Sequence, residues 1–311
     1  MQNMKNFGQW LTERLGCKTQ KISINAGFTC PNRDGRVGVD GCTYCNNQTF
    51  NPEYCRTEKS ITQQLEEGKR FFGKKYPDLK YLAYFQAYTN TYAPLSTLKL
   101  KYEEALAVPD VIGLVIATRP DCVDEALLDH LASLAADRQA FVLIEYGIES
   151  VYDRTLLRIN RGHDFACTQW AVAETAKRGI PCGGHVILGL PGESRADMIN
   201  EARILSSLPL STLKLHQLQL IKGTKMAEEF FADPSDFLRM TAEEYADLVV
   251  EFLQNLRSDI ILERFVSQSP ASLLAVPGWG LKNYQFTALV NKRLCRKEQV
   301  AGSKEQVAVG G

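Results

Sequence analysis

Short apolar runs rich in β-branched residues alternate with longer amphipathic segments along most of this chain. The apolar runs predict strands at residues 21–25, 81–85, 111–118, 141–148, 182–188 and 212–218. The amphipathic segments predict helices at 60–76, 95–107, 123–136, 165–178 and 194–208. Ser60 followed by Gln63 is a capping box, which supports the start of the first of these helices. Strands that alternate with helices in this way predict parallel βαβ units.

Right-handed crossovers allow either an open doubly wound sheet or a barrel. We favour a partial, TIM-like (β/α)6 barrel, because polar and glycine-rich segments recur just after each strand, where barrels carry their active sites. After residue 220 the alternation stops, and helices at 225–231 and 241–256, a strand at 260–265 and a basic helix follow. We therefore expect an α/β protein with a core barrel over 1–220 and a small α+β extension over 221–311. Residues 301–311 are expected to fray.

Composition narrows the class of protein. A 45% hydrophobic and 23% charged chain of 311 residues is ordinary for a globular protein. A formal net charge of zero excludes a strongly basic nucleic-acid binder, although it leaves room for a local basic patch. The N-terminus lacks an apolar signal core, and no apolar run is long enough to span a bilayer. We expect a cytoplasmic protein with no membrane attachment, whose nine cysteines serve metal binding or catalysis rather than disulfides.

Three of those cysteines form the most informative motif. Cys30 is separated by eleven residues from the pair Cys42-x-x-Cys45. Three soft thiolates with no fourth partner at close spacing suit an iron–sulfur cluster with one open iron. The alternative is a structural zinc site completed by Cys55. Zinc sites usually pair two short cysteine spacings, and Cys55 has none, so the cluster is favoured.

Further motifs stand at the ends of successive predicted strands. They are TRPD at 118–121, GIES at 147–150 and ILGLPGE at 187–193, with INRGH at 159–163 between the last two. With the cysteines, they make the chain resemble the radical S-adenosylmethionine (SAM) superfamily. The chain is more closely similar to the YhcC/YtqA-type family, a neighbour of the elongator catalytic subunit and the oxygen-independent coproporphyrinogen oxidases. The resemblance covers about residues 7–284, and the eleven-residue spacing is that of the elongator-like branch.

This resemblance implies a mechanism and cofactors. The three thiolates would hold a [4Fe–4S] cluster whose open iron binds the methionine part of SAM. One electron, from a reduced flavodoxin or ferredoxin-type donor, would then cleave SAM to a 5′-deoxyadenosyl radical. By position, Glu149 matches a ribose-binding residue and Arg161 the arginine that meets the methionine carboxylate. Ile187 and Gly189 match the apolar shelf for adenine.

Other positions depart from the relatives' pattern. Tyr44 directly precedes the last cysteine of the motif. Gln86 stands where the relatives have a Gly-Gly pair that meets the methionine amino group, and His185 stands where they have aspartate. The relatives' acidic residue on strand three has no counterpart, because Ile116 and Ala117 are apolar. For these positions the resemblance implies a place in the cofactor site rather than a particular contact.

The substrate is the least determined part of the function. Candidate substrate-side residues around the barrel mouth are Tyr88, Thr89, Arg119, Glu145, His163, Lys214, His216 and Lys222. The relation to the elongator subunit favours tRNA as a partner, with modification of the wobble uridine, although the acetyltransferase domain of that subunit is absent from this sequence. A small-molecule oxidoreductase of the coproporphyrinogen oxidase type is the second interpretation. A zinc-stabilised binding module is the third.

Overall fold

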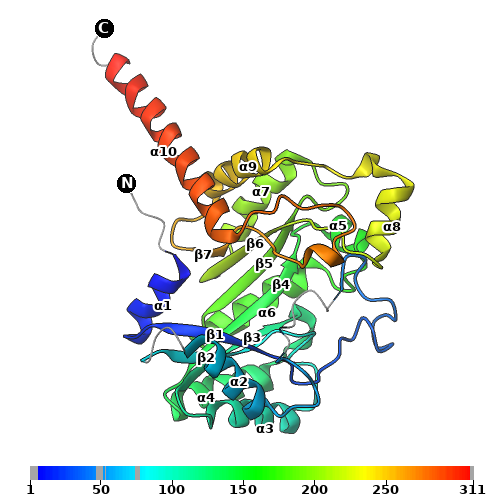
Figure 1. Ribbon diagram of the computed structural model, residues 1–311, viewed down its shortest axis with the longest axis vertical. Helices are drawn as coiled ribbons and strands as arrows, with labels where there is room; N and C mark the ends of the chain where they lie inside the picture. The colour runs from blue at the N-terminus through cyan, green and yellow to red at the C-terminus, as the bar shows by residue number, and fades with distance from the viewer. Residues whose placement is uncertain (1–5, 47–51, 53, 74–77, 309–311) are drawn as a thin grey trace.

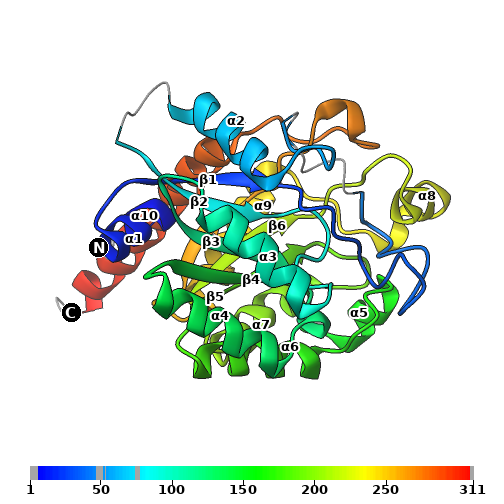
Figure 2. The same cartoon turned by 90° about the horizontal axis from the view of Figure 1, so that it is seen from below.

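Seven parallel strands form one sheet in which strands that follow one another in the chain are neighbours. The computed structural model describes residues 6–46, 52, 54–73 and 78–308, with side chains up to residue 296. The strands are β1 (Thr19–Ile24), β2 (Lys80–Phe85), β3 (Val111–Thr118), β4 (Phe141–Glu149), β5 (Cys182–Leu188), β6 (Thr212–Gln217) and β7 (Ile261–Arg264). The sheet curls into a half-barrel, which confirms the predicted fold class (Figures 1 and 2).

Crossover helices cover the outer face of the half-barrel (Figure 2). The helices are α1 (Phe7–Leu15), α2 (Ile61–Gly73), α3 (Leu95–Leu106), α4 (Glu125–Asp137), α5 (Asp153–Arg158), α6 (Phe165–Lys177), α7 (Arg195–Ser206), α8 (Lys225–Ala232), α9 (Ala242–Asn255) and α10 (Asn283–Ala308). The capping box of Ser60 and Gln63 is present, while residues 74–76 of that predicted helix lie outside the described residues. In the described part of the chain, no helix is both long and apolar enough to cross a membrane.

The outer face of the sheet is apolar, and the inner face is apolar where it meets α1. On the outer face, Leu114 and Ile116 pack in the large core beneath the helices. On the inner face, Leu82 and Val115 form a second cluster that also contains Leu11 of α1. The sequence interpretation did not identify α1, which fills the base of the half-barrel lumen and leaves the other end open.

The strand β7 extends the same sheet, since it pairs with β6 through Thr212 with Ile261, Leu213 with Leu262 and Lys214 with Arg264. The sequence placed this strand in a separate extension, because the βα alternation stops at residue 220. The division of the chain at that residue stays a prediction.

The helix α10 packs against α9 and projects away from the body of the protein (Figure 1). It continues to Ala308, so the expected fraying is wrong for residues 301–308. Lysine, glutamate, glutamine and alanine in this stretch are good helix formers, which explains the longer helix.

Gly68 gives a test of the packing of α2 on β1. A Cβ atom at Gly68 would lie 2.3 Å from Cγ2 of Ile22, whereas a Cβ at Gly8 in α1 would meet its nearest atom at 3.5 Å. We expect Gly68→Ala to lower the free energy of unfolding by about 1–3 kcal/mol through overpacking, although alanine favours helices. Gly8→Ala is the matched control and should keep or raise stability. Chemical denaturation measures both, and a stabilised Gly68→Ala variant would contradict the packing.

Candidate active site

The three cysteines lie on the loop that follows β1, at the end of the sheet where α5 and α8 also lie (Figures 1 and 2). Hydrogen bonds fix this loop to the segment after α5. The side chain of Asn32 donates to the carbonyl of Asn160 at 2.6 Å, and the side chain of Asn160 donates to the carbonyl of Gly41 at 2.8 Å. The backbone N–H of Thr43 donates to the carbonyl of Ile159 at 3.0 Å. The cysteine loop, which follows the edge strand β1, is therefore held by the segment that follows the central strand β4 and α5.

All three thiols line one cavity of about 1850 Å³ that continues into the lumen. The Cys42 sulfur lies 3.6 Å from both Nδ2 of Asn32 and Nη1 of Arg161. Burial raises the pKa of the Cys45 thiol, and the negative charges of Cys42 and Cys30 raise it further. Three cysteine side chains on the wall of one cavity offer soft sulfur ligands to a metal centre. This donor set fits an iron–sulfur cluster.

Cys55, the fourth ligand in the zinc alternative, has another partner in this structure. Among the residues that the structure describes, no three Cys, His, Asp or Glu side chains are grouped closely enough to hold a single metal ion, and this includes Cys30, Cys42 and Cys45. The Cys55 thiol donates a hydrogen bond to the carbonyl of Ser23 at 2.8 Å, and burial raises its pKa to about 12. Cys55 is therefore a buried structural residue on the described geometry.

A buried arginine lies beside the cysteine loop at the end of β4. The Arg161 guanidinium donates to the carbonyl of Gly147 at 2.6 Å and lies 3.6 Å from the Glu149 carboxylate. Burial opposes its charge, but Tyr44, Cys42 and Glu149 raise the pKa of Arg161 well above its usual value, so it stays protonated. Its Nε atom has no hydrogen-bond partner among the described residues, and it is available to a ligand.

The structure brings most of the sequence-predicted cofactor residues to this cavity. Its wall includes Tyr44, Gln86, Glu149, Arg161, His185 and Ile187 as well as the three cysteines. Gly189 is not part of the wall. It takes a left-handed backbone conformation, φ +94°, in the turn after β5, and its N–H points to the sulfur of Met198 at 3.1 Å.

Most of the substrate-side candidates also lie on the cavity wall, and two lie outside it. Tyr88, Thr89, Arg119, Glu145, Lys214 and His216 line the cavity. His163 and Lys222 lie outside its wall and bond to the backbone: the His163 ring to Asp164 at 3.0 Å, and Lys222 to Ser272 at 2.9 Å.

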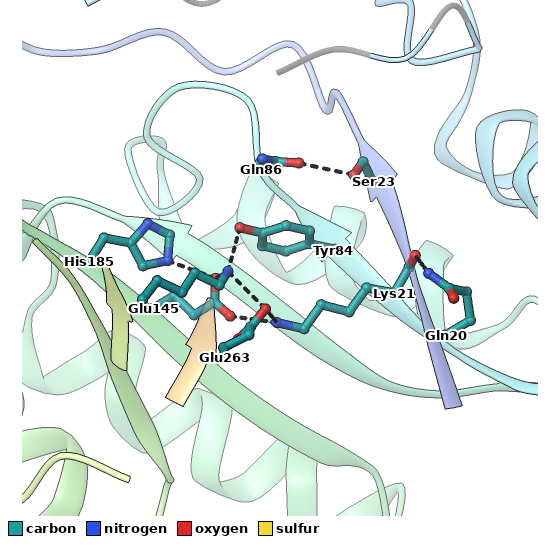
Figure 3. A network of polar contacts seen from close by, with 9 residues as sticks. Gln20, Lys21, Ser23, Tyr84, Gln86, Glu145, His185 and Glu263 are labelled. Carbon is teal, nitrogen blue, oxygen red and sulfur yellow. Dashed lines mark hydrogen bonds and ion pairs between the residues drawn. The ribbon is translucent and has the colours of Figure 1, made fainter. Parts of the chain in front are cut away.

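Deeper in the lumen, Glu145 on β4 is a buried carboxylate between two lysines (Figure 3). Lys21 on β1 lies 2.7 Å from one of its oxygens, and Lys214 on β6 lies 2.5 Å from the other. Burial would raise the pKa of Glu145, but the two ammonium groups hold it well below its usual value. Glu263 on β7 joins the same network, at 2.7 Å from Lys21 and 3.2 Å from Lys214. Lys21 and Glu263 thereby connect the two edge strands of the half-barrel.

The sequence interpretation missed Lys21, Tyr84 and Glu263 as members of this site. The Tyr84 hydroxyl lies 3.1 Å from the Lys214 ammonium group. A charged residue inside an otherwise apolar strand was the available signal, because such a residue must find a partner when it is buried. The partners come from strands far apart in the sequence, so the sequence alone did not predict which charged residues pair with one another.

Two histidines, His185 on β5 and His216 on β6, lie beside the charged network, and their ring centres are 5.4 Å apart. The Nε2 atom of His185 is 3.0 Å from the Glu145 carboxylate. Because that carboxylate accepts, Nε2 carries the proton, and the other ring nitrogen points away from Glu145 (Figure 3). The Nδ1 atom of His216 is 2.5 Å from the hydroxyl of Ser267, and its Nε2 has no partner among the described residues. Burial lowers the pKa of both rings, which keeps them neutral.

Comparison with known proteins defines the class. The sequence model of the radical SAM superfamily matches residues 25–205, more than half of the chain, and the Radical SAM C-terminal domain matches residues 210–296. The chain therefore belongs to the radical SAM superfamily.

Curated relatives cover nearly the whole chain. It is 37% identical to YtqA of Bacillus subtilis over 91% of this chain and 87% of that protein. It is 36% identical to YhcC of Escherichia coli over 88% of this chain and 86% of that protein. A weaker relative is the tRNA uridine(34) acetyltransferase of Methanocaldococcus infernus, with 28% identity over 60% of this chain and 34% of that enzyme.

Among solved structures, the fold is similar to that of Elp3 from Methanocaldococcus infernus. The TM-score is 0.64 at 17% identity, over 90% of this chain and 63% of that one. This likeness shows the fold alone.

Lys214 offers a test of the charged network. Its removal leaves Glu145 buried with one ammonium partner, so Lys214→Met should lower the free energy of unfolding at neutral pH by about 3 kcal/mol. A carboxylate whose pKa is lowered on folding stabilises the protein above its unfolded pKa, about 4.3, and this contribution is lost as the pH falls. The variant should therefore show a shallower loss of stability on acidification.

Lys177→Met, at an exposed ion pair, is the control and should leave the melting temperature unchanged. Denaturation at several pH values measures both effects. Equal stability curves for wild type and Lys214→Met would contradict the network.

Proposed function

We propose that this protein holds a [4Fe–4S] cluster through Cys30, Cys42 and Cys45 and reductively cleaves SAM. The observation that supports the proposal is that Cys30, Cys42, Cys45 and the charged Arg161 all line the same cavity. When bound, the cluster supplies the single electron that breaks the sulfonium C–S bond and yields the 5′-deoxyadenosyl radical. The protein itself binds the cofactor, orients it and excludes water.

Each cofactor role belongs to a residue at the end of a strand. The unpartnered Nε atom of Arg161 suits the methionine carboxylate of SAM. The Glu149 carboxylate, next to that guanidinium, suits the ribose hydroxyls. Ile187 supplies the apolar contact for adenine, whereas Gly189, the other residue expected there, lies outside the cavity wall and shapes the turn after β5. Tyr44, Gln86 and His185 complete the cofactor wall, with the Gln86 side chain oriented by the Ser23 hydroxyl at 2.9 Å.

The electron comes from outside the chain in this proposal. A reduced flavodoxin or ferredoxin would dock at the cysteine loop, since that loop carries the cluster ligands. Cluster assembly and free thiols require a reducing compartment, which places the activity in the cytoplasm.

Cysteine substitution tests the cluster and separates it from zinc. We expect Cys30→Ala, Cys42→Ala and Cys45→Ala each to lose the brown colour, the iron and sulfide content and the formation of 5′-deoxyadenosine after anaerobic reconstitution. Cys55→Ala and Cys17→Ala are matched controls and should retain all three. Loss of metal in Cys55→Ala, together with bound zinc in the wild type, would refute the cluster and favour the four-cysteine zinc site.

A tRNA substrate is a second, more specific candidate. It is supported by the similarity of 28% over 189 residues to an enzyme named tRNA uridine(34) acetyltransferase. A base in a single-stranded anticodon loop can be splayed out to enter a cavity. The cavity of about 1850 Å³ is large enough for SAM and one nucleotide together.

Binding to RNA tests this candidate. We expect a tRNA anticodon stem–loop to bind the cluster-loaded, SAM-bound protein with an affinity that falls as salt is raised. The same stem sequence with a closed, fully paired end is the control and should bind more weakly. Equal affinity for both, or no binding at low salt, would count against RNA and favour a small-molecule substrate.

A further inference from the structure

The charges in the lumen do not cancel. Lys21 and Lys214 are each bonded to the carboxylates of Glu145 and Glu263, so these four residues are balanced (Figure 3). Both histidines are neutral, because burial lowers their pKa values. Arg264, on β7 next to Glu263, lines the same cavity. Together, these seven residues carry an excess of one positive charge.

The sheet register places Arg264 on the lumen side. A β-bulge between β6 and β7 shifts the pairing, so that Arg264 lies opposite Lys214. Paired residues on neighbouring strands share a face of the sheet, and Lys214 points into the lumen. His216 follows Lys214 by two positions on β6, so it lies on the same face of the sheet as Lys214 and Arg264. The positive charge of Arg264 contributes to lowering the pKa of His216, after burial and the charge of His185.

Arg264 is distinguished from the other charged residues of the wall. In the described part of the cavity, each of the others has an ion pair or a hydrogen bond: Arg33 with Cys45, Arg119 with Asp121, Arg161 with Glu149 and Arg257 with Asp259, besides the lumen network. Arg264 has no such partner in the same part of the chain. On the neighbouring strand β6, the Nε2 atom of His216 is buried and also has no hydrogen-bond partner among the described residues.

The tautomer of His216 can adapt to an anion. Its Nδ1 contacts the Ser267 hydroxyl, which can either donate or accept a hydrogen bond. If the hydroxyl donates to Nδ1, the proton of the neutral ring sits on Nε2, which then becomes a donor into the cavity. A guanidinium and an N–H donor that reach the same space from neighbouring strands can together bind an oxyanion.

We propose that Arg264 and His216 form a subsite for one oxyanion of the substrate, either a carboxylate or a phosphodiester. The inference rests on the proposed function, because it assumes that the substrate enters the lumen beside SAM. The subsite is separate from the place assigned to the methionine carboxylate, which is at Arg161 beside Gly147 of β4 and the cysteine loop. An anionic substrate group held on β6 and β7 would be anchored while the rest of the substrate extends toward the cofactor.

The test uses two pairs of probes that differ by one negative charge. Orotate against uracil reports on a carboxylate, and uridylyl-uridine against uridine reports on a phosphodiester. With cluster-loaded, SAM-bound protein, at least one anionic member should bind about tenfold more tightly than its neutral partner. The pair that shows this preference identifies the source of the oxyanion.

Substitution of Arg264 assigns the preference to this residue. Arg264→Met keeps the length and apolar stem of the side chain and should abolish the preference, whereas Arg264→Lys should keep part of it. Because Arg264 has no described partner, neither change removes a native contact, and thermal melting checks the fold. The control is Arg138→Met, at an exposed pair with Glu103, which should keep the full preference.

Substitution of His216 separates ligand binding from a structural role. A glutamine places its amide near the position of Nε2, whereas an asparagine places it near Nδ1, where it can keep the contact with Ser267. Ligand binding therefore predicts that His216→Gln keeps more of the anion preference than His216→Asn. A purely structural role for the contact with Ser267 predicts the reverse order.

Equal binding of the charged and neutral probes would overturn the proposal, as would a preference that persists in Arg264→Met. Weaker binding of SAM itself in Arg264→Met would instead assign this residue to the cofactor and would also overturn it. Formation of 5′-deoxyadenosine by the wild type, measured in the same samples, reports separately on the proposed function. A failure of the subsite is thereby distinguished from a failure of the radical chemistry.

Discussion

The structure depends on a buried carboxylate held between two lysines from different strands. Glu145 lies at the centre of the lumen, with Lys21 from one edge of the half-barrel and Lys214 from near the other. Removing these charges from water costs several kcal/mol for each ion, and only close ion pairs offset that cost. A half-barrel has no hydrogen-bonded closure between its edge strands, and the contact of Lys21 with Glu263 provides an electrostatic one.

This arrangement gives the cavity two chemically different ends. At the carboxyl ends of the strands, soft thiols and the Arg161 guanidinium suit a metal cluster and the carboxylate group of its cofactor. Deeper along β5, β6 and β7, neutral imidazoles and Arg264, which has no partner among the described residues, suit a polar substrate. The helix α1 fills the base of the lumen, so both groups of residues face the cavity from its walls.

The sequence predicted the local elements well and the long-range contacts poorly. The strands and their order followed from apolar runs, and the cysteine spacing located the cluster loop, because both signals are local. The joining of β7 to the sheet was missed, since nothing in residues 261–264 identifies β6 as their partner. Lys21 and Glu263 were missed for the same reason: Lys21 meets Glu145 and Glu263, which lie 124 and 242 positions further along the chain. The motif residues were found because the family resemblance supplied their roles, whereas Arg264 belongs to no such motif.

The central claim is that Cys30, Cys42 and Cys45 leave one iron of a cluster open to SAM. Electron paramagnetic resonance of the reconstituted, one-electron-reduced protein tests it most directly, because ligand binding at an iron changes the spectrum of the cluster. The account predicts a [4Fe–4S] signal that shifts when SAM is added and that is absent from a variant with all three cysteines replaced by alanine. A signal that SAM does not change, or a protein that takes up no iron, would contradict it.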